Sequence, residues 1–196
     1  MLELHDVVIE PRRQTISLTL DDGRLALLSA SIRSEATAVL RAVMGLQPIA
    51  GGHISIDGEL LTPLSASYFR HDMAYVPSRL VLIPGQDRVC DVYRMVTSLE
   101  ANKLSLEKNK DTRLWTSLSP AARYLELLRC VAQLKRRLVL VDAPMVELTM
   151  SELGSAIALF GQMTEAGSSV LAVSNRLPSM HITENITYLN NEDFQR

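Results

Sequence analysis

Apolar and polar residues alternate along the first part of the chain with the period of half-buried β-strands. The alternation covers residues 2–9 and 14–20, and residues 24–29 follow as a short, mainly apolar run typical of a fully buried strand. Residues 53–56 repeat the strand pattern. Turn sequences separate these segments: Asp21-Asp22-Gly23, Gly51-Gly52 and Asp57-Gly58. The N-terminal part therefore predicts antiparallel β-structure followed by a buried strand.

Helical and strand patterns alternate through the remainder of the chain. Apolar residues fall on one helical face between residues 34 and 45, and Gly45 favours the end of that helix. Ser119 and Pro120 are residue types that begin helices, so a second helix is predicted from there to about Arg136. A third helix is predicted at 151–165, and strands are predicted at 73–77, 138–144, 168–174 and 187–189. This order indicates an α/β domain with a mainly parallel sheet and an antiparallel start.

Residues 86–117 differ from the rest of the chain because they are polar and rich in helix-forming residues. The charged run from Glu107 to Arg113 within them is typical of a solvated surface loop. We therefore expect one domain over residues 1–196, with a reduced helical subdomain inserted at about 86–136.

The composition fits one globular domain and argues against several classes of partner. Hydrophobic residues make up 47% of the 196 residues, which is enough for a substantial core. The net charge of −2 and the pI near 6.1 give no basic surface for nucleic acid or for an anionic membrane. The aromatic share of 5% also argues against base stacking, so no nucleic-acid partner is expected.

The cysteines and the N-terminus predict a protein of the cytoplasm. Cys90 and Cys130 have neither a CxxC spacing nor a neighbouring histidine, so we expect two free thiols, buried or half-buried, in a reducing compartment. The first residues lack the basic start and apolar core of a signal peptide. No apolar run reaches about eighteen residues, so direct membrane insertion is not expected, and any membrane association would go through a partner.

Four stretches, in this order and at these spacings, resemble the ABC transporter ATP-binding cassette (ATPase) family. The first, LRAVMGL at 40–46 followed by GGHISIDGELL at 51–61, is similar to the segment after the phosphate-binding loop. The others are similar to the Q-loop segment, the signature helix with the Walker B strand, and the switch strand: YVPSRLVLIPG (75–85), SLSPAARYLELLRCVAQLKRRLVLVDAP (117–144) and VLAVSNR (170–176). The resemblance spans roughly residues 1–177. It implies a P-loop NTPase-like α/β core with an N-terminal antiparallel β part and a reduced helical lobe.

The phosphate-binding loop implied by this resemblance is altered. Such a loop exposes backbone N–H groups through glycines, places a lysine on the phosphates and holds Mg²⁺ with a serine or threonine. No glycine lies between Arg24 and Met44. The lysine position falls on Glu35 or, after a shift of one residue, on Ala36. The degenerate loop positions are Ser29, Ser34, Glu35, Ala36 and Thr37.

Charge also argues against triphosphate at this loop. Glu35 would stand close to the phosphates, and two like charges about 4 Å apart repel by several kcal/mol at an intermediate dielectric. Arg33 could supply a substitute cation, although a solvated surface arginine is the simpler interpretation. Thr37 keeps a hydroxyl at the position expected to face Mg²⁺.

The Q-loop, Walker B and switch positions implied by the resemblance are altered as well. Ser78 replaces the Q-loop glutamine, and Asn175 replaces the switch histidine. Asp142 keeps the Walker B aspartate, but Ala143 replaces the glutamate that would act as general base. Thr149 stands where the family has the D-loop aspartate. Phosphoryl transfer depends on positioned charges, and these positions no longer supply them.

The signature sequence implied by the resemblance has also lost features that would contact a nucleotide. Its positions read Ser119, Pro120 and Ala121. Proline removes a backbone donor, and alanine prevents the close backbone approach that glycine permits.

Asp142 and Thr37 remain, and each has an ordinary structural interpretation. An aspartate at the end of a strand often accepts hydrogen bonds from loop N–H groups, and a threonine in the first turn of a helix can cap it. We therefore expect no catalytic residue, no metal site and no bound ATP or Mg²⁺.

The resemblance and the altered site together suggest a non-catalytic, pseudo-ATPase subunit that is a binding or regulatory partner of an ABC-type assembly. Because family members dimerise, the implied partners are an intact ABC ATPase subunit or an ABC permease, in a homo- or heterodimer. Two alternatives stay open: a cassette with weak or altered nucleotide binding, and a soluble scaffold or regulator unrelated to transport.

The histidines suggest no other catalytic arrangement. His5, His53, His71 and His181 are scattered along the sequence, with no acid or nucleophile at a telling spacing. We expect His71 and Asp72 to form an exposed pair before a strand.

Overall fold

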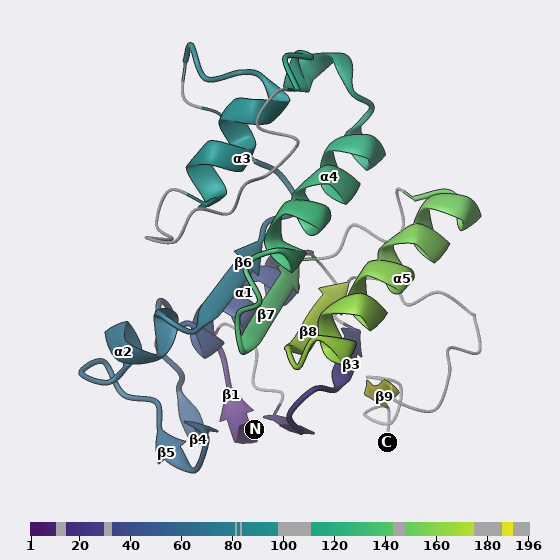
Figure 1. Cartoon of the computed structure of the whole chain (residues 1–196). Coiled ribbons are helices and arrows are strands. Elements are labelled where there is room, and N and C mark those ends of the chain that lie inside the picture. Colours follow the sequence, from purple (N-terminus) through teal and green to yellow (C-terminus); the bar gives the residue numbers. More distant parts are fainter. Residues whose placement is uncertain are drawn as a thin grey trace.

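The computed structural model contains a parallel sheet, an antiparallel sheet and helices that pack on both (Figure 1). The parallel sheet lies at the centre, and the antiparallel sheet lies on the side of the N-terminus. The structure describes the following residues: 1–10, 15–29, 33–80, 82, 84–97, 111–142, 148–174 and 186–189.

The central sheet is parallel between all its described neighbours, in the order β6-β7-β8-β3-β9. Its strands are β3 (Leu25–Ser29), β6 (Met73–Val76), β7 (Leu138–Asp142), β8 (Ser169–Ser174) and β9 (Ile186–Leu189). Every residue of β7 and β8 is buried. A parallel sheet covered on both faces needs such continuous apolar runs, which explains the unbroken pattern in the sequence.

The second sheet is antiparallel and has the order β2-β1-β4-β5. Its strands are β1 (Leu2–Val8), β2 (Thr15–Leu20), β4 (Gly51–Ile56) and β5 (Glu59–Leu60). Leu2, Leu4 and Val7 on β1 are buried, whereas His5 and Asp6 are exposed. One face of this sheet therefore packs on the core, and the other faces solvent.

Helices cover both faces of the parallel sheet. They are α1 (Arg33–Val43), α2 (Ala66–Arg70), α3 (Val89–Thr97), α4 (Pro120–Ala132) and α5 (Met150–Glu165), with a 3₁₀ turn η2 (Trp115–Ser117). One core cluster joins α1 and the antiparallel sheet to one face of the parallel sheet. The other cluster joins α3, α4 and α5 to the opposite face. Alternate residues of β3, β6, β7 and β8 thus contribute to the two core clusters on opposite faces of the sheet.

Local capping explains where several helices begin and end. The Ser119 hydroxyl accepts a hydrogen bond from the Ala122 N–H at 3.1 Å and so caps α4. Thr149 and Glu152 form a reciprocal capping box that begins α5. Gly45 follows α1 at φ +65°, and a Cβ there would lie 2.5 Å from the Cβ of Ala66. Glycine therefore permits both the left-handed turn and the close packing of α2 against the end of α1.

The structure confirms the α/β fold with its antiparallel start, and it corrects one detail. The predicted helix from Ser119 to about Arg136 ends at Ala132, and Lys135 just beyond it adopts φ +50°. Within the predicted helical segment 86–117, the described residues form α3 and the short turn η2, and residues 98–110 lie outside the described ones. No helix among the described residues is both long and apolar enough to cross a membrane.

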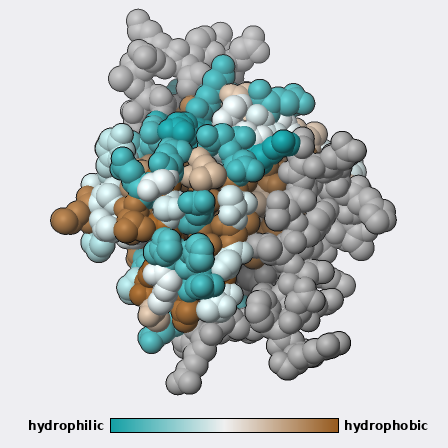
Figure 2. Space-filling view, turned by 90° about the horizontal axis from the view of Figure 1, so that it is seen from below, coloured by the Kyte–Doolittle hydropathy of each residue, from teal (hydrophilic) through white to brown (hydrophobic). Residues whose placement is uncertain are grey.

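Exposed apolar side chains gather beside α2. In the view from below in Figure 2, hydrophobic atoms reach the surface on the side where Figure 1 places α2 and β5. The large exposed hydrophobic residues of this region are Leu46, Leu60, Leu64 and Tyr68. Leu64 is 93% exposed, so it contributes nothing to the core.

Candidate functional site

The candidate site lies at the carboxyl edge of the parallel sheet. β3 ends at Ser29 and the chain continues into α1, β6 ends at Val76 shortly before Ser78, and β7 ends at Asp142. In an open α/β sheet, the carboxyl ends of parallel strands meet at one edge, where ligands usually bind. The topology thus brings the predicted phosphate-loop, Q-loop and Walker B positions to the same edge.

Three of the predicted site residues are joined by hydrogen bonds. The Thr37 hydroxyl donates to Oδ2 of Asp142 at 3.0 Å, and the Ser78 hydroxyl donates to the same oxygen at 3.1 Å. Asp142 is only 4% exposed. We call Thr37, Ser78 and Asp142 the hydroxyl–carboxylate cluster. It links α1, the segment after β6 and the end of β7 at a buried point.

This geometry corrects the ordinary roles predicted for two of these residues. Asp142 does not accept loop N–H groups among the described residues; it accepts the hydroxyls of Thr37 and Ser78. Thr37 is not at the start of α1, which begins four residues earlier at Arg33, so it is no helix cap. Its hydroxyl serves tertiary packing between the helix and β7.

The described donors on Asp142 are neutral. A buried carboxylate is costly unless hydrogen bonds or a cation compensate it, and bonds to an ionised acceptor are stronger than neutral ones. The two hydroxyls supply that compensation on one oxygen. The cluster therefore ties α1 and the segment after β6 to the end of β7 through the Asp142 carboxylate.

Two tyrosines near the cluster are affected by its charge. Burial raises the pKa of Tyr124 on α4, and the negative charge of Asp142 adds to the rise. Burial also raises the pKa of Tyr75 on β6, again with Asp142 adding and Arg41 opposing. The Tyr124 hydroxyl is buried and has no hydrogen-bond partner within the described part of the chain. The surroundings of Asp142 therefore favour neutral groups.

Several other predicted site positions lie at the starts of helices. Glu35 lies in the first turn of α1, where a negative charge favours the helix dipole and opposes a bound anion. Ser119 caps α4, Pro120 is the first residue of that helix and Ala121 follows it. Thr149 caps α5. The signature and D-loop positions thus have structural roles at two helix starts.

The other phosphate-loop positions follow the strand-to-helix connection: Ser29 ends β3, and Ser34 and Ala36 lie within α1. Ala143 and Asn175 lie outside the described residues.

The described residues do not fit a phosphate and magnesium site of the expected kind. The strand-to-helix segment that would cradle phosphate contains no glycine, and its helix begins with an acidic first turn. No lysine lies between Arg24 and Val43 to reach the phosphates.

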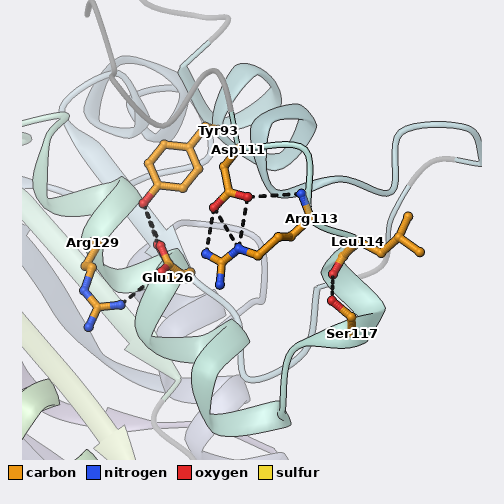
Figure 3. Close-up of polar contacts among 7 residues, drawn as sticks. All are labelled: Tyr93, Asp111, Arg113, Leu114, Ser117, Glu126 and Arg129. Carbon is orange, nitrogen blue, oxygen red and sulfur yellow. Dashed lines mark hydrogen bonds and ion pairs between the residues drawn. The ribbon is translucent and has the colours of Figure 1, made fainter.

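A second polar network fixes the helical lobe beside the site (Figure 3). The Tyr93 hydroxyl on α3 donates to Oε2 of Glu126 on α4 at 3.0 Å, and Arg129 donates to Oε1 of Glu126 at 3.2 Å. Asp111 and Arg113 form a two-pronged ion pair, and their carbonyls accept the N–H groups of Cys90 and Val89 respectively at the start of α3. Tyr93 and Glu126 thereby join α3 to α4, and the Asp111–Arg113 segment is held against the start of α3. Sequence patterns did not single out Tyr93 or Glu126, because a buried glutamate in a helix looks like a surface residue until its partners are known.

Buried acids in this lobe predict a loss of stability at high pH. Burial raises the pKa of the Cys130 thiol to about 12 from a reference of 9.0, and Glu126 adds to the rise. Burial also raises the pKa of Tyr124 from a reference of 10.0. A raised pKa keeps the folded group protonated while the unfolded chain ionises, so this stability is complete below about pH 9 and falls above it. Each such group contributes a slope of about 1.4 kcal/mol per pH unit.

Urea unfolding at a series of pH values tests this expectation, and Tyr124→Phe isolates one group. The substitution removes a buried hydroxyl that has no described partner, so stability at neutral pH should change little. Above pH 10 the variant should lose stability more slowly than the wild type, by about 1.4 kcal/mol per pH unit. Equal slopes for the two proteins would contradict the proposed ionisation of Tyr124.

Comparisons with known proteins place the fold. No model of a known protein family matches the sequence. No curated protein sequence matches it either. Solved structures do match, at low sequence identity.

Three solved structures illustrate the likeness. An ATP-binding protein assigned to an ABC transporter of Pyrococcus furiosus gives a TM-score of 0.74 at 15% identity, covering 96% of this chain and 96% of the other. A dimeric ATP-binding cassette in a post-hydrolysis state with ADP and Pi gives 0.67 at 17% identity, covering 90% and 88%. A part of an ABC transporter complex of Clostridium perfringens gives 0.69 at 11% identity, covering 88% and 77%. The chain therefore has the P-loop NTPase-like fold of ABC ATP-binding cassettes.

Proposed function

We propose that this chain is a non-catalytic, pseudo-ATPase subunit of an ABC-type assembly that acts as a binding or regulatory partner. The observation that carries the proposal is the hydroxyl–carboxylate cluster: Thr37 and Ser78 both donate to Asp142. Thr37 and Asp142 hold the positions that would face magnesium, and Ser78, in place of the Q-loop glutamine, donates to the same carboxylate. The fold is retained around a site whose charges no longer suit a nucleotide.

The chemistry of phosphoryl transfer supports this proposal. Transfer to water needs a cation on the phosphates, a bound metal ion and a group that orients the attacking water. This chain has no lysine from Arg24 to Val43, and its α1 begins with Glu35 in the first turn. Alanine follows Asp142 in place of a base. Each change removes stabilisation of the transition state, and none of the altered residues offers an equivalent group.

The proposed partner is an intact ABC ATPase subunit or an ABC permease. Among the structural neighbours, one is a dimeric cassette and another is part of a transporter complex, so the fold is used in both kinds of contact. Pairing with such a partner would place this chain at the cytoplasmic side of a membrane without inserting it. The proposal includes a heterodimer and a homodimer.

A second function is favoured by one observation. Thr37 and Asp142 lie side by side, which is the arrangement a residual magnesium site would need. A cassette with weak or altered nucleotide binding would break the contact between Thr37 and Asp142 and insert the ion. A soluble scaffold unrelated to transport is the remaining alternative, and it shares the prediction of no nucleotide binding.

Titration with Mg-ATP separates the first two functions. At millimolar Mg-ATP we expect no calorimetric heat of binding and no rise in melting temperature, because the glycine cradle and the lysine are missing. Any ligand that binds only the folded state must raise its stability, so the thermal measurement is sensitive to weak binding. An intact ABC cassette measured in parallel is the positive control. A thermal shift with micromolar affinity would reject the proposal in favour of an altered nucleotide site.

Co-purification from the native host distinguishes the partner-bound subunit from the scaffold. Recovery of an ABC permease or an intact cassette with this chain would support the proposed assembly. Recovery of neither, with other proteins in stoichiometric amount, would favour a regulator outside transport.

A further inference from the structure

The solvent-facing side of the antiparallel sheet holds two histidines next to each other. His5 on β1 pairs directly with His53 on β4 in the antiparallel register. Their ring centroids are 5.2 Å apart and the rings are nearly parallel, at 8°. Both residues are exposed, and the His5 side chain is 70% exposed. His5 and His53 lie far apart in the sequence, and the pairing of β1 with β4 brings them together.

A β-bulge fixes the position of this pair. The register of β1 shifts after His5 against β4, because Asp6 is an additional residue at φ +48°. The N–H of Asp6 donates to the Ser17 hydroxyl at 3.0 Å, and that hydroxyl donates to Oδ1 of Asp6 at 3.0 Å. The bulge thus orients the backbone on which His5 stands and holds a carboxylate beside it.

The carboxylate of Asp6 is placed to support His5. Its Oδ2 lies 3.7 Å from Nδ1 of His5. A carboxylate beside Nδ1 leaves Nε2 as the nitrogen open to a ligand, and outer carboxylates lie beside metal-bound histidines in this way. Asp6 would act through His5, because its carboxylate lies beside Nδ1, the ring nitrogen that would not bind the metal.

We propose that His5 and His53 form a two-imidazole chelating site for a divalent transition-metal ion, with Asp6 as the positioning residue for His5. Imidazole nitrogens bind such ions at about 2 Å, so the two Nε2 atoms must approach to about 3 Å. Rotation of two exposed rings on a fixed pair of strands achieves this, because neighbouring groups leave both rings accessible. Among first-row ions, Cu²⁺ should bind most tightly and Ni²⁺ and Zn²⁺ more weakly.

Titration of the tag-free protein with Cu²⁺, in the presence of glycine as a weak competing chelator, tests the site. We expect one equivalent of Cu²⁺ with nitrogen ligation in the electron paramagnetic resonance spectrum. Bound metal should also raise the melting temperature, since it links β1 to β4 in the folded state only. This proposal does not depend on the proposed function, because neither readout involves nucleotide or transport.

Four variants give the matched comparison. His5→Gln and His53→Gln should each abolish the glycine-resistant binding, and Asp6→Asn should weaken it about tenfold, as expected for loss of an outer carboxylate. Asparagine tolerates the left-handed conformation of position 6, so this variant keeps the bulge. His71→Gln changes an exposed histidine on another part of the chain and should bind as the wild type does.

Two results would overturn the proposal. Either single histidine variant could bind Cu²⁺ like the wild type while melting normally without metal, which would reduce the pair to a stacking contact between strands. Alternatively, His71→Gln could lose the binding, which would place the metal elsewhere.

Discussion

Replacing Gly52 with alanine is expected to destabilise the protein by more than about 3 kcal/mol, and it can prevent folding altogether. Gly52 adopts φ +73°, and a Cβ there would lie 2.3 Å from the carbonyl oxygens of both His5 and Asp6. These atoms belong to the backbone of the β1 bulge, so no side-chain rotation relieves the overlap. Alanine would force β4 away from β1 at the centre of the antiparallel sheet.

Two other glycines serve as controls that separate the cost of the left-handed conformation from the cost of the steric overlap. Gly58 has a similar φ of +79°, and a Cβ at this position would meet no other atom within 4 Å. Gly58→Ala should therefore cost only the left-handed conformation, about 1–2 kcal/mol. Gly161 lies in α5 with open space around it, and Gly161→Ala should be neutral or stabilise by up to about 1 kcal/mol. Urea unfolding of the three variants measures these effects. If Gly52→Ala costs no more than Gly58→Ala, then the close approach to the bulge is not important for stability.

The fold could be predicted because its signals are local. The apolar runs at β3, β7 and β8 are continuous, and a sheet covered on both faces demands that pattern. Ser119 and Gly45 mark helix ends through their own conformational preferences. The sequence predicts a longer α4, because Leu134 continues its apolar spacing beyond Ala132, where the helix ends.

The site could be predicted only in part, because its contacts join distant segments. The family resemblance identified Thr37, Ser78 and Asp142 as phosphate-loop, Q-loop and Walker B positions. It did not show that they bond to one another, since Thr37 is 105 residues and Ser78 is 64 residues from Asp142. The local rules that assign helix caps and loop acceptors gave Thr37 and Asp142 partners nearby, and tertiary packing supplied different ones.

The histidine pair was missed for a related reason. Which residue of β1 faces which residue of β4 depends on strand register, and one inserted residue changes every pairing beyond it. The Asp6 bulge is such an insertion. A histidine at position 5 therefore acquires its partner from the way two strands align, for which the sequence gives no direct signal.

Removing the hydroxyl of Thr37 is expected to lower the free energy of unfolding by about 1.5–3 kcal/mol in the absence of any ligand. Thr37→Val keeps the shape of the side chain and deletes the donor that contacts Asp142 at 3.0 Å. The buried carboxylate then keeps only Ser78 among its described donors. An uncompensated buried charge is costly, so the loss exceeds that of an ordinary hydrogen bond.

Thr37→Ser is the matched control, because it deletes only the methyl group and keeps the donor. It should cost less than about 1 kcal/mol, and Ser78→Ala should resemble Thr37→Val in direction. If the hydroxyl–carboxylate cluster takes the place of a bound ion, these differences appear in urea unfolding of the nucleotide-free protein and do not change when Mg-ATP is added. If instead the residues form a residual magnesium site, Mg-ATP should stabilise the wild type and Thr37→Ser but not Thr37→Val. A Thr37→Val variant as stable as the wild type would show that the contact is incidental, and the proposed function would then lose its main structural support.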